Sequence, residues 1–357
     1  FPAQIAQVAL WLMDHQINQQ VSEKFGEYFA RIPLSASSTI VCGNALRVDW
    51  NDVVPAEKLS FIMGNPPFLG KNYQNELQKA DMEFVFSGMK STASLDFVTA
   101  WYRKAVDMMS TAQRIVAAFV STNSITQGEQ VYMLWPDLLS KGVHINFAHR
   151  TFQWNNEARG NAAVHCVIVG FSVCEADKKW LFEYEGIKGE AHARQVKYIN
   201  PYLVDAPNVI IPARRVSLCA SPEMINGSKP TDGGNLLLDE KERLELLSKE
   251  PQAAEWIRPF SMGDEYINGA ARYCLWLKSC PPNKLREMPE VLNRVEAVKR
   301  MRQESTKAAT RDWANRPTVF TEDRQPESFY LALPRVSSER RNYIPIGFLP
   351  PEHVAGD

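Results

Sequence analysis

Residues 60–70 read Ser-Phe-Ile-Met-Gly-Asn-Pro-Pro-Phe-Leu-Gly, and this stretch decides the fold that we expect. The apolar run at 61–63 predicts a short strand, which ends at Gly64. Each of the two prolines that follow fixes its own φ and lacks an N–H donor, and a residue before a proline is kept out of the helical region. We therefore expect a stiff loop at the carboxyl end of a strand, where open α/β sheets bind ligands.

The loop carries groups that suit a planar amine. The Asn65 side-chain oxygen and the Pro66 carbonyl can both accept hydrogen bonds from a single exocyclic NH2 group. Such bonds orient the amine and raise the electron density on its nitrogen without a charged base, which is a preorganisation that favours catalysis. Phe68 can stack on the ring that carries the amine. The loop therefore predicts a site for an amino-heterocycle, and an ordinary Pro-Pro turn after a strand is the alternative.

The tetrapeptide Asn65-Pro66-Pro67-Phe68 resembles the catalytic motif of the S-adenosylmethionine-dependent methyltransferases that make N6-methyladenine in DNA. A similar motif occurs in enzymes that methylate glutamine amides or RNA bases. The resemblance implies that these four residues form the catalytic site and that Asn65 also lies against the cofactor. The motif alone does not choose among these substrates, so the rest of the chain has to decide.

Length and composition allow two domains of ordinary globular type. The chain has 357 residues, of which 45% are hydrophobic and 23% are charged. No apolar run reaches membrane-spanning length, so we expect no membrane partner. Residues 1–20 place apolar side chains at helical spacing without a basic start, which predicts a core helix and not a signal peptide.

The six cysteines are scattered, with no Cys-x-x-Cys pair and no partnered histidine cluster. We therefore expect no metal site and no disulfide framework, and a reducing cytoplasm is the expected compartment. The formal net charge is −1, so a nucleic-acid binder of this composition needs its basic residues gathered in one region.

Residues 38–45 predict a strand that ends in a turn at Asn44 and Ala45. In the methyltransferases that the chain resembles, this turn usually carries Asp and contacts the adenine edge of the cofactor. The resemblance implies the same contact for Asn44 and Ala45, although an Asx turn without a ligand is the alternative. The polar stretch 71–90 resembles a loop that closes over the flipped base, or else it is a solvated connector.

An amphipathic helix is predicted over 94–112, since its apolar residues recur at helical spacing. The resemblance implies that Asp96 and Phe97, at its start, bind the cofactor, whereas a plain amphipathic helix needs no ligand. Residues 114–121 predict a buried parallel strand, and 143–149 and 162–172 predict two closing strands. The resemblance implies a target-base pocket lined by Phe68, Asn123, Phe152 and Trp154.

This order of elements matches the second half of a class I methyltransferase, an α/β sheet of Rossmann-like type. The first half is missing, because the chain contains no glycine-rich turn of the Gly-x-Gly type for the methionine part of the cofactor. We therefore expect a sheet that is incomplete in its N-terminal half, within a longer protein. The strand that ends at Asn65 would then have an exposed edge.

From about residue 196 the prolines become frequent and the basic residues cluster, with a basic helix at 294–311. We expect an α+β domain over 196–357, whose end can lie beyond this sequence, after a methyltransferase domain over 1–195. The second domain resembles the target recognition domain of the MmeI-like restriction–modification enzymes. The resemblance rests on Asp-Gly-Gly-Asn-Leu at 232–236, Arg-Tyr-Cys-Leu-Trp at 272–276 and Ser-Ser-Glu-Arg-Arg-Asn-Tyr-Ile-Pro at 337–345.

The last of these segments has residues suited to reading bases. Arginine pairs bidentately with guanine, and glutamate accepts a hydrogen bond from the cytosine amine. The resemblance implies that Glu339 and Arg341 set the base preference, while Arg335 and Arg340 could hold phosphates beside Ser337. A surface ladder of salt bridges is the alternative for any single one of these residues.

Taken together, these features predict a DNA adenine-N6 methyltransferase of the restriction–modification type, with S-adenosylmethionine as methyl donor and double-stranded DNA as partner. The target adenine would be flipped out of the duplex. Two other functions stay open. One is a non-catalytic DNA-binding specificity module, and the other is a protein-glutamine or RNA methyltransferase, which would not need the arginine-rich second domain.

Overall fold

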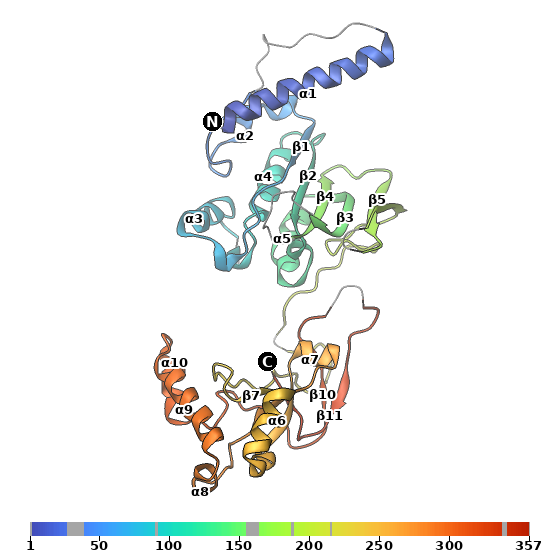
Figure 1. Ribbon diagram of the computed structural model, residues 1–357. Helices are drawn as coiled ribbons and strands as arrows, with labels where there is room; N and C mark the ends of the chain where they lie inside the picture. The colour runs from blue at the N-terminus through green and yellow to red at the C-terminus, as the bar shows by residue number, and fades with distance from the viewer. Residues whose placement is uncertain are drawn as a thin grey trace. The chain divides into compact units, whose positions relative to one another are not determined.

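The chain forms two compact units, Phe1–Val216 and Ser217–Asp357 (Figure 1). The computed structural model describes residues 2–26, 39–89, 92–154, 164–186, 189–214, 216–337 and 341–356. Each unit has its own hydrophobic core. The division between the two compact units falls after Val216.

A six-stranded mixed sheet forms the centre of the first unit, in the order β1-β2-β4-β3-β5-β6. β1 and β2 run parallel, and β4 lies antiparallel between β2 and β3. The closing pair β3 and β4 is followed by β5, parallel to β3, and by β6, antiparallel to β5. The bounds are β1 Phe61–Gly64, β2 Val116–Thr122, β3 His144–Trp154, β4 Val164–Ser172, β5 Lys179–Tyr184 and β6 Ala191–Val196.

Helices α4 and α5 pack on one face of this sheet through buried aromatic rings. Tyr102 of α4 stacks on Phe171 of β4 at 5.1 Å and lies 6.2 Å from the Trp135 ring of α5. All three side chains are fully buried, so they join both helices to the sheet. The mixed α/β architecture is thereby confirmed. The helices of this unit are α1 Pro2–Phe25, α2 Trp50–Val53, α3 Glu76–Val85, α4 Thr99–Met109 and α5 Gly128–Ser140.

Local sequence determines where α3 begins. The Asn75 side chain accepts a hydrogen bond from the Gln78 N–H, and the Gln78 side chain accepts one from the Asn75 N–H, both at 2.9 Å. This reciprocal capping box satisfies two backbone donors that the first turn would otherwise leave unpaired.

Two expectations for the start of the chain are wrong. α1 is a helix, but it is not a core helix, because Ile5, Val8 and Leu12 are 55%, 51% and 58% exposed. Residues 39–45 form no strand in the described part of the chain. Helical periodicity predicts a helix but not what covers its apolar face, and a strand needs a hydrogen-bonded neighbour.

The expected exposed edge at β1 is observed. Among the described residues β1 pairs only with β2, and Phe61 and Met63 are 68% and 81% exposed. An edge strand of this kind presents unpaired backbone groups. Among the helices that the structure describes, none combines the length and apolar character that a membrane crossing requires.

The second unit has strands and helices, as expected for an α+β domain. A four-stranded sheet has the order β12-β8-β9-β7, and β10 and β11 form a separate antiparallel pair. The strands are β7 Leu237–Asp239, β8 Ile257–Ser261, β9 Arg272–Leu275, β10 Tyr330–Ala332, β11 Gly347–Leu349 and β12 Val354–Ala355. The helices are α6 Glu240–Lys249, α7 Gly263–Asn268, α8 Pro282–Arg286, α9 Pro289–Gln303 and α10 Ala308–Arg311.

Two of the motifs that suggested this domain are structural. Gly233 and Gly234 have φ values of 64° and 84°, which residues with a side chain rarely adopt, so the turn that leads to β7 requires them. Asp232 closes the same turn by accepting a hydrogen bond from the Leu236 N–H at 2.5 Å. The motif at 272–276 contains β9, in which Cys274 and Leu275 are fully buried.

Candidate functional site

The Asn65 loop leaves the sheet where β1 ends, since Gly64 is the last residue paired with β2. Pro66 is buried, whereas Asn65 and Pro67 are exposed. Phe68 is half-buried and packs against the core of the first unit. Within the described residues the Asn65 side-chain amide makes no hydrogen bond, so its oxygen and nitrogen are both free to bind a ligand.

Leu69 anchors the far end of this loop through both of its backbone groups. Its N–H donates to Asp96 Oδ1 at 3.1 Å. Its carbonyl accepts hydrogen bonds from the Phe97 N–H at 3.0 Å and from Gln74 Nε2 at 3.1 Å. With prolines at its start and these bonds at its end, the loop has little conformational freedom.

The predicted cofactor residues Asp96 and Phe97 therefore lie directly beside the Asn65 loop, just before α4 and not within its first turn. Asp96 is 5% exposed, and burial raises the pKa of its carboxyl, while the hydrogen bonds from the Val98 and Leu69 N–H groups act in the opposite direction. The Phe97 ring is 6% exposed and meets the Trp101 ring edge-on at 5.4 Å. Their contact with a cofactor stays a prediction.

Asn44 forms the Asx turn that was the alternative to a cofactor contact. Its Oδ1 accepts a hydrogen bond from the Leu46 N–H at 3.0 Å, and its Nδ2 donates to Asp81 Oδ2 at 2.7 Å. Asp81, on α3, also pairs with Arg47 Nε at 2.6 Å. Ala45 is exposed, and its carbonyl accepts the indole N–H of Trp50 at 2.8 Å. Binding of the cofactor by Asn44 and Ala45 stays a prediction too.

The strand register brings the predicted base-pocket residues to one edge of the sheet. Thr122, just before Asn123, pairs with Cys166 on β4, and Cys166 pairs with Phe152 on β3. Asn123 and Phe152 thus lie at the end of the sheet where β1 and β2 have their carboxyl ends. Trp154 pairs through its backbone with Val164, but its side chain lies outside the described part of the structure.

An aromatic cluster that the sequence did not indicate supports Phe152. The Phe152 ring stacks on Tyr184 at 5.3 Å, and the His149 ring stacks on Phe182 at 4.1 Å. His149 Nδ1 and the Tyr184 hydroxyl are hydrogen-bonded at 2.8 Å. Burial lowers the pKa of His149, which favours the neutral ring. β5 carried no motif, so only the pairing of β3 with β5 reveals this cluster.

The Cys166 thiol lies at the same edge and is fully buried. Burial raises its pKa to about 11, so the thiolate is scarce at neutral pH. Nucleophilic catalysis by this cysteine is therefore not supported. Among the described residues no group of His, Cys, Asp and Glu could hold a metal ion.

The described DNA-recognition candidates share one loop of the second unit. Arg335, Ser337 and Arg341 are exposed between β10 and β11, whose register pairs Leu331 with Phe348. Glu339 and Arg340 lie outside the described residues. The antiparallel pair explains how the chain holds both ends of this loop, whereas its contact with bases stays a prediction.

The basic helix contributes less exposed charge than the sequence suggested. Arg302 of α9 is fully buried and donates hydrogen bonds to five backbone carbonyls at 2.7–3.2 Å. Arg294 bonds to the Asn235 carbonyl and to Glu242. These two arginines therefore stabilise the unit. The carbonyls that Arg302 binds belong to Pro230, Thr231, Trp313, Arg316 and Val319.

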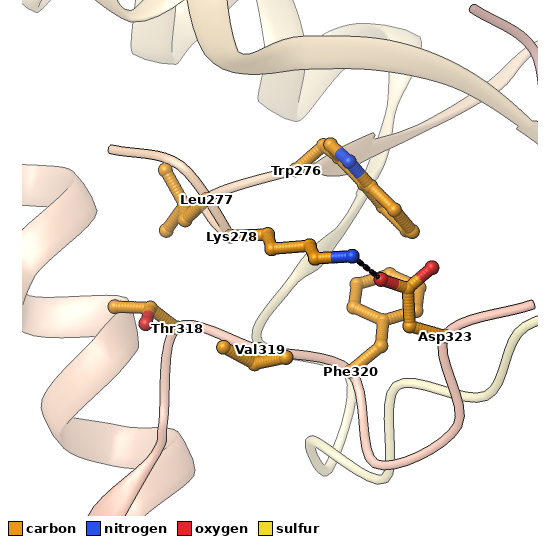
Figure 2. A pocket seen from close by; sticks show the side chains of 7 residues that line it. All are labelled: Trp276, Leu277, Lys278, Thr318, Val319, Phe320 and Asp323. Atoms are coloured by element: carbon orange, nitrogen blue, oxygen red, sulfur yellow. Dashed lines mark hydrogen bonds and ion pairs between the residues drawn. The ribbon is translucent and has the colours of Figure 1, made fainter. Parts of the chain in front are cut away.

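A small pocket of the second unit is filled by its own side chains. Figure 2 shows the ion pair between Lys278 and Asp323 across it. Trp276 and Phe320 meet edge-on at 4.9 Å, and the remaining space is too small for a ligand. The pocket is therefore a packing feature, lined by Trp276, Leu277, Lys278, Thr318, Val319, Phe320 and Asp323.

Comparison with known proteins assigns both parts of the chain. The family model described as "MmeI, DNA-methyltransferase domain" matches residues 1–183, and "MmeI, target recognition domain" matches residues 205–357. The protein named DNA methyltransferase A of Bacillus subtilis (strain 168) is 37% identical over 351 residues, which are 97% of this chain and 39% of that protein.

A solved structure of the Type IIL restriction-modification enzyme MmeI in complex with DNA is 50% identical, with a TM-score of 0.84. The match covers 100% of this chain and 48% of that one. The chain thus spans less than half the length of both relatives. These matches confirm the resemblance to MmeI-like enzymes, and the chain belongs to the MmeI family.

Proposed function

We propose that this chain carries the methyl-transfer and target-recognition parts of a site-specific DNA adenine-N6 methyltransferase. The observation that carries the proposal is the Asn65 loop, with a free amide at its start and an anchored Leu69 at its end. The printed names of the relatives, a DNA methyltransferase and a restriction-modification enzyme in complex with DNA, support the substrate class.

Asn65 and the Pro66 carbonyl are the acceptors for the adenine amine in this proposal. Two hydrogen bonds from the amine would orient it and leave more electron density on its nitrogen. Because a neutral amide oxygen is too weak a base to take up a proton, the nitrogen accepts the methyl group with both of its protons in place. The resulting cationic amine then releases one proton to solvent, so no general base is needed. One preorganised hydrogen bond at a reacting centre contributes on the order of 10²–10³-fold in rate.

S-adenosylmethionine, when bound, supplies the methyl group. The residues present fit part of this cofactor. Asn44 is exposed and retains one amide hydrogen and one oxygen lone pair beyond those that its Asx turn and Asp81 use, so it can still bond an adenine edge. Asn44, Ala45, Asp96 and Phe97, together with Asn65, are the proposed cofactor-binding residues.

The target adenine would enter the edge of the sheet as a flipped base. Phe68 is half-buried, so it is not fully enclosed by the core against which it packs. Phe68, Asn123, Phe152 and Trp154 are the proposed pocket residues. The parallel pair β1–β2 and the antiparallel closing pair β3–β4 support a class I methyltransferase sheet over 1–195.

In the second domain, proposed over 196–357, the loop between β10 and β11 would read the DNA sequence. Arg341 and Glu339 are the proposed base-reading residues. Arg335 and Arg340 would position the backbone with Ser337 beside them. The match of this region to a target recognition domain supports the assignment.

Transfer of a labelled methyl group to mixed-sequence duplex DNA tests the proposal in the full-length protein. We expect N6-methyladenine with the wild type and with Asn208→Ala, which alters an exposed asparagine outside the Asn65 loop, but not with Asn65→Ala. A wild type that binds DNA but transfers no methyl group would instead favour the non-catalytic specificity module. The use of Asn44 in an Asx turn is the observation that keeps this second function in view.

A further inference from the structure

Two glutamine side chains hold the segment that follows the Asn65 loop. Gln74 is 8% exposed, and its Nε2 donates to the Leu69 carbonyl at 3.1 Å and to the Leu95 carbonyl at 3.0 Å. Gln130, on α5, accepts a hydrogen bond from the Asp96 N–H at 3.0 Å and donates to the Ser94 carbonyl at 3.3 Å. The Gln74 amide thus joins the Asn65 loop to Leu95, and the Gln130 amide binds the backbone of Ser94 and Asp96.

The Gln74 amide lies close in the chain to the catalytic candidates. Leu69 follows Phe68 directly, and the prolines at 66 and 67 make the link back to Asn65 stiff. A displacement of the Leu69 carbonyl therefore moves the adjacent Phe68, and the fixed φ angles of Pro66 and Pro67 limit how far the chain between Phe68 and Asn65 can absorb it.

We propose that Gln74 is a positioning residue for methyl transfer, with Gln130 as its support from α5. This inference rests on the proposed function. Gln74 binds no substrate in this scheme. It fixes where the Asn65 amide and the Phe68 ring stand when the target base arrives, and a misplacement of about 1 Å at a reacting centre costs on the order of 10²-fold in rate.

The surroundings of Gln74 favour this role over one in global stability. The neighbouring side chains Tyr73 and Leu77 are 81% and 79% exposed, so this segment contributes little to the core. Gln74 is buried because it points at two backbone carbonyls. Loss of its amide should therefore loosen the Asn65 loop locally without unfolding the unit.

The test compares Gln74→Met with Gln78→Met in the full-length protein. Methionine has nearly the length of glutamine but cannot donate to the two carbonyls. Gln78 belongs to the capping box of α3 and accepts a hydrogen bond from the Asn75 N–H, so its replacement disturbs the same helix start without touching Leu69. Gln74→Glu, which places an acceptor against two carbonyls, is the second variant.

Steady-state methyl transfer to a duplex with the mapped site gives kcat and KM, and hydrogen exchange reports on the Leu69 N–H. For both Gln74 variants we expect kcat to fall about 10–100-fold, with KM for DNA and for S-adenosylmethionine within about two-fold. We expect exchange at Leu69 to become faster in these variants, and neither change in Gln78→Met.

Unchanged kcat and unchanged exchange in Gln74→Met would overturn the inference while leaving the proposed function intact. A loss of activity that equals the unfolded fraction, with the folded protein at the wild-type kcat, would overturn it as well. If the wild type transfers no methyl group to DNA, the proposed function itself fails and the positioning role fails with it.

Discussion

The buried guanidinium of Arg302 allows a sharp prediction, because it separates a structural arginine from a DNA-binding one. The Arg302→Met variant keeps an unbranched apolar side chain in the core but removes every hydrogen bond to the five carbonyls. These carbonyls belong to two segments, 230–231 and 313–319, which lie far apart in the sequence and meet at α9.

A buried polar group left without a partner costs about 1–3 kcal/mol. The five carbonyls do not each incur this full cost, because most of their residues are partly exposed and water can hydrogen-bond to some of them. The variant also no longer has to desolvate a guanidinium, which costs several kcal/mol. We therefore expect the free energy of unfolding of the second unit to fall by about 3–5 kcal/mol. For a unit of this size that lowers Tm by roughly 6–20 °C.

The measurement is thermal unfolding of the full-length protein, with DNA binding as a function of salt for the folded variants. Arg300→Met is the matched control, since Arg300 is exposed on the same helix. We expect it to change Tm little, and to lower the salt slope by about 1 if α9 contacts phosphates. Arg302→Lys should recover part of the stability, and folded Arg302→Met should keep the wild-type salt slope although it has lost the charge. A stability loss below about 1 kcal/mol for Arg302→Met, or a salt slope reduced by about 1 for the same variant, would refute the reasoning.

Three further predictions concern the first unit. Burial raises the pKa of Asp96, so the free energy of unfolding falls as the pH rises from about 4 through the folded-state pKa. Asp96→Asn, which keeps an oxygen for the Leu69 N–H, should lose this pH dependence in urea unfolding. A pH dependence of the unfolding free energy equal to that of the wild type would contradict this. Burial lowers the pKa of His149, so the free energy of unfolding should fall as the pH drops below about 6.5. The fall should be smaller in His149→Gln. An equal fall in both proteins between pH 7.5 and 5.5 would argue against a buried, neutral His149. Tyr102→Phe removes the 2.8 Å hydrogen bond to the buried Ser121 hydroxyl and should cost about 1–2 kcal/mol in denaturant unfolding; a neutral result would mean that Ser121 finds another partner.

Much of the candidate site could be predicted from local sequence. The constraint of Pro66 and Pro67 is covalent, so the stiff loop after β1 follows from the tetrapeptide whatever surrounds it. The capping box of Asn75 and Gln78 likewise depends only on two residues that are three positions apart. Gly233 and Gly234 adopt positive φ values because glycine has no Cβ.

Other features needed contacts between distant segments. The exposed apolar side chains of α1 have the same periodicity that a core helix would have, and the residues at 39–45 have strand-forming composition without a paired neighbour. The polar stretch at 71–90 does not indicate that Gln74 is buried, because its burial depends on the carbonyls of Leu69 and Leu95.

The sequence by itself determined the stiff loop, the glycine turn and the start of α3, since each depends on covalent geometry or on residues a few positions apart. It did not determine the start of α4, which was expected at residue 94 and lies at Thr99. Only the tertiary structure decided burial and charge. It placed Arg302 in the core of the second unit, raised the pKa of Asp96 and brought Phe152 onto Tyr184. The physical reason is that desolvation and hydrogen-bond partners come from whatever packs nearby, and neighbours in space are not neighbours in the chain.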